Sequence, residues 1–162
     1  MYKVSKKFPH SEGLSVCFRQ WHATFSHCRF LHGYSLSVEV IFEGHKLDPR
    51  NWLVNFGGFG DFKEWLHENF DHTTLIAEDD PELPLFKQLD KAGIIQLKVL
   101  PKVGCEAFAE YIHNYLANPE VYYRRPGIAD RTFLTVVVGE HEGNHASFRG
   151  EVNVEQNRKD TK

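Results

Sequence analysis

The sequence predicts an α+β fold, in which helices pack on one face of a largely antiparallel sheet. Three observations support this prediction. Two segments near the N-terminus alternate apolar and polar residues with the period of a β-strand, two later segments have the apolar spacing of amphipathic helices, and the last apolar runs return to strand character. The predicted order is therefore two strands, a helix, a strand, a helix and two strands.

The first two predicted strands cover residues 14–25 and 34–43, where apolar and polar side chains alternate. The short connector FSHCRFLHG between them favours an antiparallel hairpin with a tight turn. Extending the period of the second strand backwards adds His32 and Tyr34 to its apolar face. The residues expected on one face of the first strand are Val16, Phe18, Gln20 and His22, and those on the apolar face of the second are Leu36, Val38, Val40 and Phe42.

Two amphipathic helices are predicted over residues 59–70 and 105–117. In the first, apolar side chains recur every three or four residues, so that one face is buried. The second is expected to stop at Asn118 and Pro119, because proline cannot continue a helix.

The remaining elements are shorter. Residues 77–93 are polar and are expected to form a loop with one short helix that Gly93 ends. Residues 94–100, 132–140 and 146–152 are predicted strands, and the polar residues 153–162 are expected to be a frayed tail.

Composition narrows the class of protein. The chain has 162 residues, which indicates a single domain, and 41% of them are hydrophobic, enough for a core. A formal charge of −3 excludes the basic surface of a nucleic-acid-binding protein. No apolar run is long enough to cross a membrane, and we expect no secretory signal. The three cysteines, an odd number without zinc-finger spacing, indicate a reducing, cytoplasmic setting.

The densest cluster of chemically active side chains is His22, His27, Cys28, His32 and Tyr34. Imidazoles at the ends of paired strands can converge on one metal ion, and three protein ligands with one open position are typical of catalytic zinc. The alternative is that these are polar turn residues without a ligand.

The thiol of Cys28 lies in the same predicted turn. Near imidazoles or a metal, a thiol can ionise and act as a base or nucleophile, whereas an isolated cysteine is more often inert. Cys17 and Cys105 are interpreted as packing residues.

Carboxylates near predicted element ends form the second set of candidates. Asp71 precedes His72 directly, which suits an orienting acid beside a proton carrier, although a helix end can favour a histidine for its dipole alone. Glu140 lies on the apolar face of a strand, where a ligand with two parallel N–H donors would pair with it, or else it lies in solvent at the strand end. Glu106 opens the second helix, where a helix dipole also favours an acid.

The ordered set of motifs resembles the 6-pyruvoyltetrahydropterin synthase and 6-carboxytetrahydropterin synthase superfamily, from about Val16 to Phe148. Phe18 through His22 match its opening Phe-x3-His, and CRFLHGY at residues 28–34 matches its Cys-x3-His-Gly-His. The later matches are Phe56-Gly57 with the following helix, Asp71-His72, Glu106 and Glu140.

The resemblance implies a tunnelling fold, with an antiparallel four-stranded sheet and two helices on one face. It also implies a homo-oligomer, a trimer or hexamer, with zinc-containing active sites between subunits. By position, His22 and His32 would be zinc ligands, with Tyr34 or His27 as the third. Cys28 would be the general base and Asp71 with His72 the proton relay. Glu140 would hold the pterin ring, assisted by Glu106.

Several positions depart from the family pattern. Tyr34 stands in place of the third zinc histidine, and the stretch between His22 and Cys28 is shorter than usual. Asn55 replaces an aspartate before Phe-Gly, and Gly104 stands where a threonine often precedes the pterin glutamate.

Three functions stay open on these grounds. The first is a zinc-dependent lyase that converts 7,8-dihydroneopterin triphosphate to 6-carboxytetrahydropterin, releases acetaldehyde and triphosphate, and supplies deazapurines such as queuosine. The second is elimination of triphosphate to the 6-pyruvoyl product. The third is a pterin- or purine-binding protein without turnover, because Tyr34 weakens the metal site.

Overall fold

In the computed structural model, the structure describes residues 1–118, 121 and 132–152. These residues form one seven-stranded sheet with three helices and three short 3-10 turns. The strands are β1 (Tyr2–Phe8), β2 (Leu14–Phe18), β3 (His32–Gly44), β4 (Thr73–Ala77), β5 (Leu97–Leu100), β6 (Thr132–His141) and β7 (Asn144–Val152). The helices are α1 (Gly60–Phe70), α2 (Leu83–Lys91) and α3 (Cys105–Ala117), and the turns are η1 (His10–Glu12), η2 (His27–Arg29) and η3 (Phe56–Phe59).

The antiparallel part of the sheet is built around the long strand β3. Strands β1 and β2 pair with successive halves of β3 on one side, and β6 pairs with it on the other and then with β7. The predicted antiparallel pairing of the first two strands is therefore confirmed, but the tight turn is wrong, because β2 ends at Phe18 and β3 begins at His32. Gly13, with a φ of 85°, lets the chain turn between β1 and β2.

The prediction of a four-stranded, wholly antiparallel sheet is wrong. Strands β4 and β5 extend the sheet beyond β2, and both the β2–β4 and β4–β5 pairs are parallel. All five residues of β4 are buried, which is typical of a parallel strand covered on both faces. Because all five residues are buried, β4 shows no alternation of apolar and polar side chains, and the sequence pattern does not indicate a strand there.

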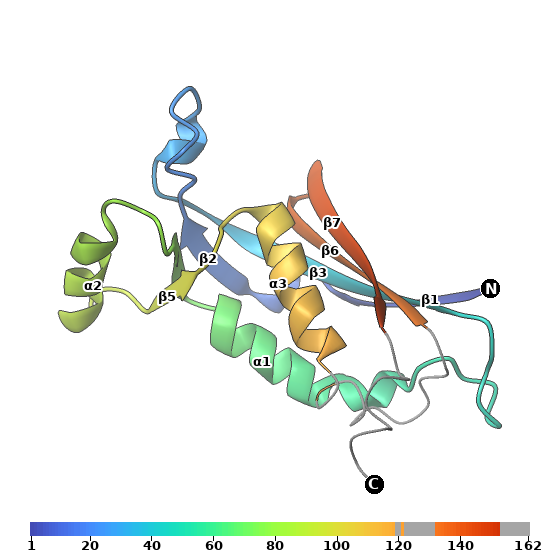
Figure 1. Cartoon of the computed structure of the whole chain (residues 1–162). Helices are drawn as coiled ribbons and strands as arrows, with labels where there is room; N and C mark the ends of the chain where they lie inside the picture. The colour runs from blue at the N-terminus through green and yellow to red at the C-terminus, as the bar shows by residue number, and fades with distance from the viewer. Residues whose placement is uncertain (119–120, 122–131, 153–162) are drawn as a thin grey trace, which may run out of the picture.

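Helices α1 and α3 cover one face of the sheet, and α2 lies beside β4 and β5 (Figure 1). The core forms between that face and the two helices, where Phe62, Leu66, Phe108 and Ile112 are fully buried. The predicted helices at 59–70 and 105–117 are confirmed, with bounds that differ by at most one residue. The short helix predicted before Gly93 is confirmed as α2. The predicted tail 153–162 and Pro119 lie outside the described residues.

The first predicted strand is too long, because β2 ends at Phe18. Residues 19–31 instead form a projecting connection that contains η2 (Figure 1). The backbone N–H of Gln20 donates to the carbonyl of Cys28 at 2.8 Å, which closes the base of this connection. His22 therefore does not share a strand face with Val16.

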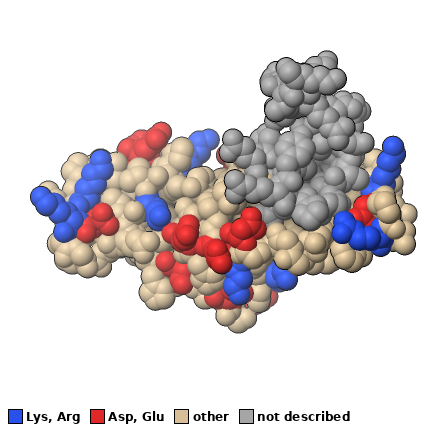
Figure 2. Space-filling view, turned by 90° about the horizontal axis from the view of Figure 1, so that it is seen from below, with Lys and Arg blue, Asp and Glu red and all other residues tan. Residues whose placement is uncertain are grey.

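Among the described residues, no helix is both long and apolar enough to span a membrane. Charge is mixed over the described part of the surface in Figure 2, with acidic side chains near the middle and basic ones mainly toward the ends. That face offers no broad basic patch for a polyanion.

Candidate functional site

Cys105, at the N-terminus of α3, interacts electrostatically with three side chains, from β3, from β6 and from α3 itself. We call Tyr34, Cys105, Glu106 and Glu140 the anchor group. Tyr34 projects from β3 toward the helices, because it pairs with the buried Val16 of β2. Glu140 follows the buried Val138 by two residues on β6 and lies within hydrogen-bonding distance of the Cys105 thiol, to which Glu106 is also close.

Burial is the largest influence on the protonation of Cys105 and Tyr34 in the anchor group. Burial, together with the nearby carboxylates of Glu140 and Glu106, raises the pKa of the Cys105 thiol to about 12. Burial likewise raises the pKa of Tyr34, with added contributions from Glu140 and from the thiols of Cys28 and Cys105. Cys105 and Tyr34 are therefore neutral hydrogen-bonding groups near neutral pH. This agrees with the interpretation of Cys105 as a packing residue.

Cys28 is held near the anchor group through Gln20. Cys28 lies in η2, where its own N–H donates to the Ser26 hydroxyl at 3.2 Å. The Gln20 side chain lies against Gly104, so close that a Cβ at that glycine would come within 2.6 Å of the Gln20 amide nitrogen. Gly104 also has a φ of 121°, which other residues adopt only with strain. The glycine in place of the family's threonine is thus explained by the backbone and by Gln20.

A second group runs from η1 to the end of α1. We call Glu12, His67, Asp71 and His72 the histidine–carboxylate chain. Asp71 Oδ1 accepts a hydrogen bond from His72 Nδ1 at 2.6 Å, and Asp71 Oδ2 lies 3.2 Å from His67 Nδ1. His67 Nε2 in turn lies 3.1 Å from Glu12 Oε1, which also meets Lys63 Nζ at 2.7 Å.

His72 borders a groove of about 610 Å³. Neighbouring residues of β2 and β3 line it together, Val16 with Cys17 and Gly33 with Tyr34. His72 has a φ of 54°, a conformation that non-glycine residues rarely adopt, and its imidazole is largely exposed. The backbone therefore holds the ring out toward the groove. Polar groove residues include Ser15, Cys17, Ser35, Thr74 and Gln96.

His22 is turned toward the loop after β4. Its Nε2 lies 3.0 Å from Asp79 Oδ2, and its ring stacks on Trp21, whose indole N–H donates to the other Asp79 oxygen at 3.2 Å. Next to this pair, Arg19 forms a bidentate bond with the buried Asp80 at 2.8 and 2.7 Å. Together these contacts fasten the projecting connection to the β4–α2 loop.

The other two predicted ligands have separate partners. His32 Nδ1 donates to the carbonyl of Phe30 at 2.7 Å, and its ring packs on Phe18 and edge-on to Tyr34. The His27 ring packs on Phe30 within η2.

These contacts do not fit a zinc site in this arrangement. The part of the chain that the structure describes contains no group of three or more His, Cys, Asp or Glu side chains that could hold a metal ion. His22 is engaged by Asp79. Tyr34, whose pKa is raised, is a poor anionic ligand at neutral pH. Of the predicted ligands, only His32 and Tyr34 are in contact with each other through their rings.

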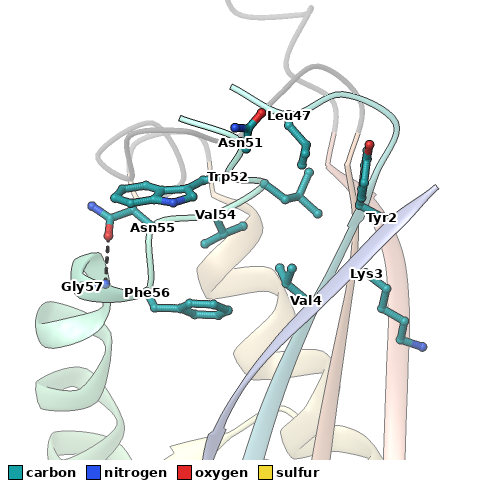
Figure 3. A pocket seen from close by; sticks show the side chains of 11 residues that line it. Tyr2, Lys3, Val4, Leu47, Asn51, Trp52, Val54, Asn55, Phe56 and Gly57 are labelled. Atoms are coloured by element: carbon teal, nitrogen blue, oxygen red, sulfur yellow. Dashed lines mark hydrogen bonds between the residues drawn. The ribbon is translucent and has the colours of Figure 1, made fainter. Parts of the chain in front are cut away.

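A separate hollow of about 580 Å³ lies at the other end of β3 (Figure 3). Trp52, Phe56 and Val4 line it, and none of the predicted site residues does. Asn55 accepts a hydrogen bond from the N–H of Gly57 at 3.0 Å, which caps η3. Asparagine in place of the family's aspartate therefore keeps the capping role.

Sequence reasoning missed Glu12, His67 and Gln20 as members of these groups. His67 could have been found, because it lies four residues before Asp71 on a predicted helix and such residues are neighbours. Glu12 and Gln20 carry no local signal, since their partners are 55 and more residues away.

Solved structures identify the class of fold. An uncharacterised protein from Wolinella succinogenes matches with a TM-score of 0.68 and 18% identity, over 91% of this chain and 97% of that one. A 6-pyruvoyltetrahydropterin synthase from Plasmodium vivax, solved as a catalytic-residue mutant, matches with a TM-score of 0.65 and 14% identity, over 93% and 98%. The chain therefore has the fold of the pterin synthases.

The family model for 6-pyruvoyl tetrahydropterin synthase matches residues 7–151, which is most of the chain. The protein belongs to the 6-pyruvoyl tetrahydropterin synthase family, as the resemblance in its motifs predicts.

Curated relatives carry a more specific name. The 6-carboxy-5,6,7,8-tetrahydropterin synthase of Rickettsia conorii is 37% identical over 57 residues, which cover 35% of this chain and 41% of the relative. The enzyme of the same name from Bacillus subtilis is 28% identical over 100 residues, 60% of this chain and 63% of the relative. The matched part of the chain thus spans less than two thirds of the length of these relatives.

Proposed function

We propose that the protein is a pterin lyase of the 6-carboxytetrahydropterin synthase type, which acts on 7,8-dihydroneopterin triphosphate and releases acetaldehyde and triphosphate. The observation that carries the proposal is the anchor group, in which two carboxylates gather around the neutral Cys105 beside Tyr34. The names of the curated relatives favour the carboxy-forming reaction over the pyruvoyl-forming one.

The anchor group suits a flat, polar heterocycle. Glu140 can accept two parallel N–H bonds from an aminopyrimidinone edge, an arrangement that is strong because the acceptor is charged. The phenol of Tyr34 and the nearby ring of His32 supply flat surfaces against which a pterin can pack. Cys28 is within electrostatic reach of Tyr34, where its thiol can exchange a proton with the substrate side chain.

We propose a homo-oligomer with the site shared between subunits, as the family resemblance implies. The groove beside His72 is also lined by Tyr34, but Glu140 and Cys105 are not among its lining residues. A ligand held in this groove can meet Glu140 when that carboxylate comes from a second copy of the protein.

The mechanism proposed for the chain's own residues does not depend on zinc. The Nδ1–H of His72 donates a hydrogen bond to Asp71, so that Nε2 is the nitrogen that can take up a proton from the substrate. Cys28 is the second proton-transfer group, and Glu140 orients the ring.

The experiment that tests this proposal is incubation of the purified protein with 7,8-dihydroneopterin triphosphate, followed by separate assays for acetaldehyde and triphosphate. We expect both products, and we expect Cys28→Ala to lose at least about 100-fold in turnover while keeping its circular dichroism spectrum and oligomeric state. Triphosphate without acetaldehyde would instead support the pyruvoyl-forming reaction.

A second candidate is a pterin-binding protein without turnover. It is favoured by the engagement of His22 with Asp79 and by the lack of a metal-holding group among the described residues. Pterin binding that depends on Glu140, with neither product formed, would support this candidate.

A further inference from the structure

We propose that Glu12 and His67 are positioning residues for His72, which hold Asp71 in place and fix the charge that Asp71 presents to the His72 ring. This inference deepens the proposed function, because it rests on His72 as a proton-transfer group. Its test below does not require activity.

The contacts form one unbroken path from η1 to the groove. Lys63 and His67 both meet Glu12 Oε1, at 2.7 and 3.1 Å. His67 meets Asp71 Oδ2 at 3.2 Å, and Asp71 Oδ1 meets His72 at 2.6 Å. Each carboxylate therefore receives two donors, and His67 is the only link between them along this path.

The position of His67 fixes its protonation. Both ring nitrogens face carboxylate oxygens, and each can donate only if the imidazole is doubly protonated. Hydrogen bonds that the His67 ring donates, to Glu12 first and then to Asp71, raise the pKa of His67, and these are the charged groups that face it. Lys63 and His67 lower the pKa of Glu12, so the contact favours the charged form of both partners.

The charge on His67 has a consequence for His72. Asp71 divides its negative charge between two histidines, because His67 occupies one oxygen and His72 the other. A carboxylate shared with a cation stabilises protonated His72 less than an unshared one. His67 therefore keeps His72 easier to deprotonate, while Asp71 holds its Nε2 outward. A proton carrier that works near neutral pH needs this balance.

The test is a histidine NMR titration of the full-length protein without substrate. His67→Gln removes the cation, and we expect the His72 pKa to rise by about 0.5 to 1 unit. Glu12→Gln is expected to lower the His67 pKa and, through it, to raise the His72 pKa by a smaller amount. Loss of Glu12 acting directly through space would instead lower the His72 pKa, so the sign separates the two routes.

Two further variants make the result decisive. In the His67→Gln background, Glu12→Gln should no longer raise the His72 pKa, as expected for coupling through His67. Glu68→Gln removes an exposed carboxylate from the same helix and should leave His72 unchanged. An unchanged or lowered His72 pKa in both Glu12→Gln and His67→Gln overturns the proposal.

Activity provides a second readout where turnover is present. In His67→Gln, the acidic limb of the pH profile of kcat should shift to higher pH by the same amount as the His72 pKa in the titration. If no turnover is found, the proposed function fails while the titration still tests the coupling. A lower kcat with no shift in either profile would show that His67 has only a structural role.

Discussion

The anchor group and the histidine–carboxylate chain control their charges in opposite ways. In the anchor group, burial is the largest influence and keeps Tyr34 and Cys105 neutral by raising their pKa values. In the histidine–carboxylate chain, burial would also raise the pKa of Asp71, but hydrogen bonds from His67 and His72 outweigh this effect, and the pKa of Asp71 is lowered. In the anchor group two neutral side chains lie beside two carboxylates, whereas in the histidine–carboxylate chain the charge of each carboxylate is divided among its partners.

The difference shows how one small sheet can offer two kinds of chemistry. A half-buried acceptor such as Glu140, beside the neutral Tyr34 and Cys105, favours a ligand that brings its own donors. An exposed imidazole at the end of a charged chain favours proton exchange with whatever reaches the groove. Each region can therefore be perturbed without the other, and the predictions below use this separation.

The largest expected effect comes from the ion pair that fastens the projecting connection to the β4–α2 loop. Asp80→Asn leaves Arg19 without its bidentate partner and should lower the free energy of unfolding by about 3 kcal/mol. Chemical denaturation followed by circular dichroism measures this loss. Asp48→Asn, at the pair with the exposed Arg50 two residues away, is the control and should cost much less. Equal losses in the two variants would contradict a special role for the Arg19–Asp80 pair.

Glu140→Gln should weaken pterin binding by about 30- to 100-fold, because a charge-assisted acceptor becomes neutral. Titration calorimetry with a reduced pterin measures the change. Glu106→Gln, at an exposed position, should weaken binding only about threefold. If Glu106→Gln has the larger effect, the ring is held from the helix rather than from β6.

The third prediction concerns the metal. The donor arrangement predicts weak zinc binding by the natural chain, and Tyr34→His together with Asp79→Asn should raise the affinity at least about tenfold by adding an imidazole and releasing His22. Competition with a chromophoric chelator measures it, with Tyr34→Phe as control. One tightly bound zinc per natural chain would sink this prediction and favour a rearranged connection.

The smallest effect is the pH dependence of stability. The pKa of folded His67 is raised, so its contribution is fully present below about pH 6.5 and is lost as pH rises through the higher folded value. The pKa values of Glu12 and Asp71 are lowered, so their contributions are present above about pH 4 and are lost in more acidic solution. In His67→Gln the loss of stability above neutral pH should be smaller, by less than about 1 kcal/mol, as measured by thermal unfolding at several pH values.

The elements with clear periodicity could be predicted from the sequence. The helix at 105–117 and the long strand β3 follow from apolar spacing, and both lie close to their predicted bounds. Strand β1 was missed because Lys6 interrupts its apolar face. Strand β4 was missed because it is short and buried throughout. Its partner β2 is far away in sequence, so only the tertiary fold reveals the parallel pairing.

The site could be predicted only in part. Asp71 and His72 are adjacent, and their contact follows from the sequence alone. The convergence of Glu106 and Glu140 on Cys105 matches the roles that the family resemblance implies, although those roles stay predictions. The prediction that the first strand continues to His22 was wrong, because after Phe18 the chain forms a connection closed by the hydrogen bond between Gln20 and Cys28. The assignment of the whole chain to one domain also stays a prediction.

The parallel pairing of β2 with β4 bears on how the protein folds. Thr73, the residue after His72, is in register with Val16, and the contacts between these strands join residues 57 apart in the chain. Closing so long a loop is slow compared with forming the β6–β7 hairpin. We therefore expect refolding to leave the His72 ring as one of the last groups to reach its native orientation, after the antiparallel strands have assembled.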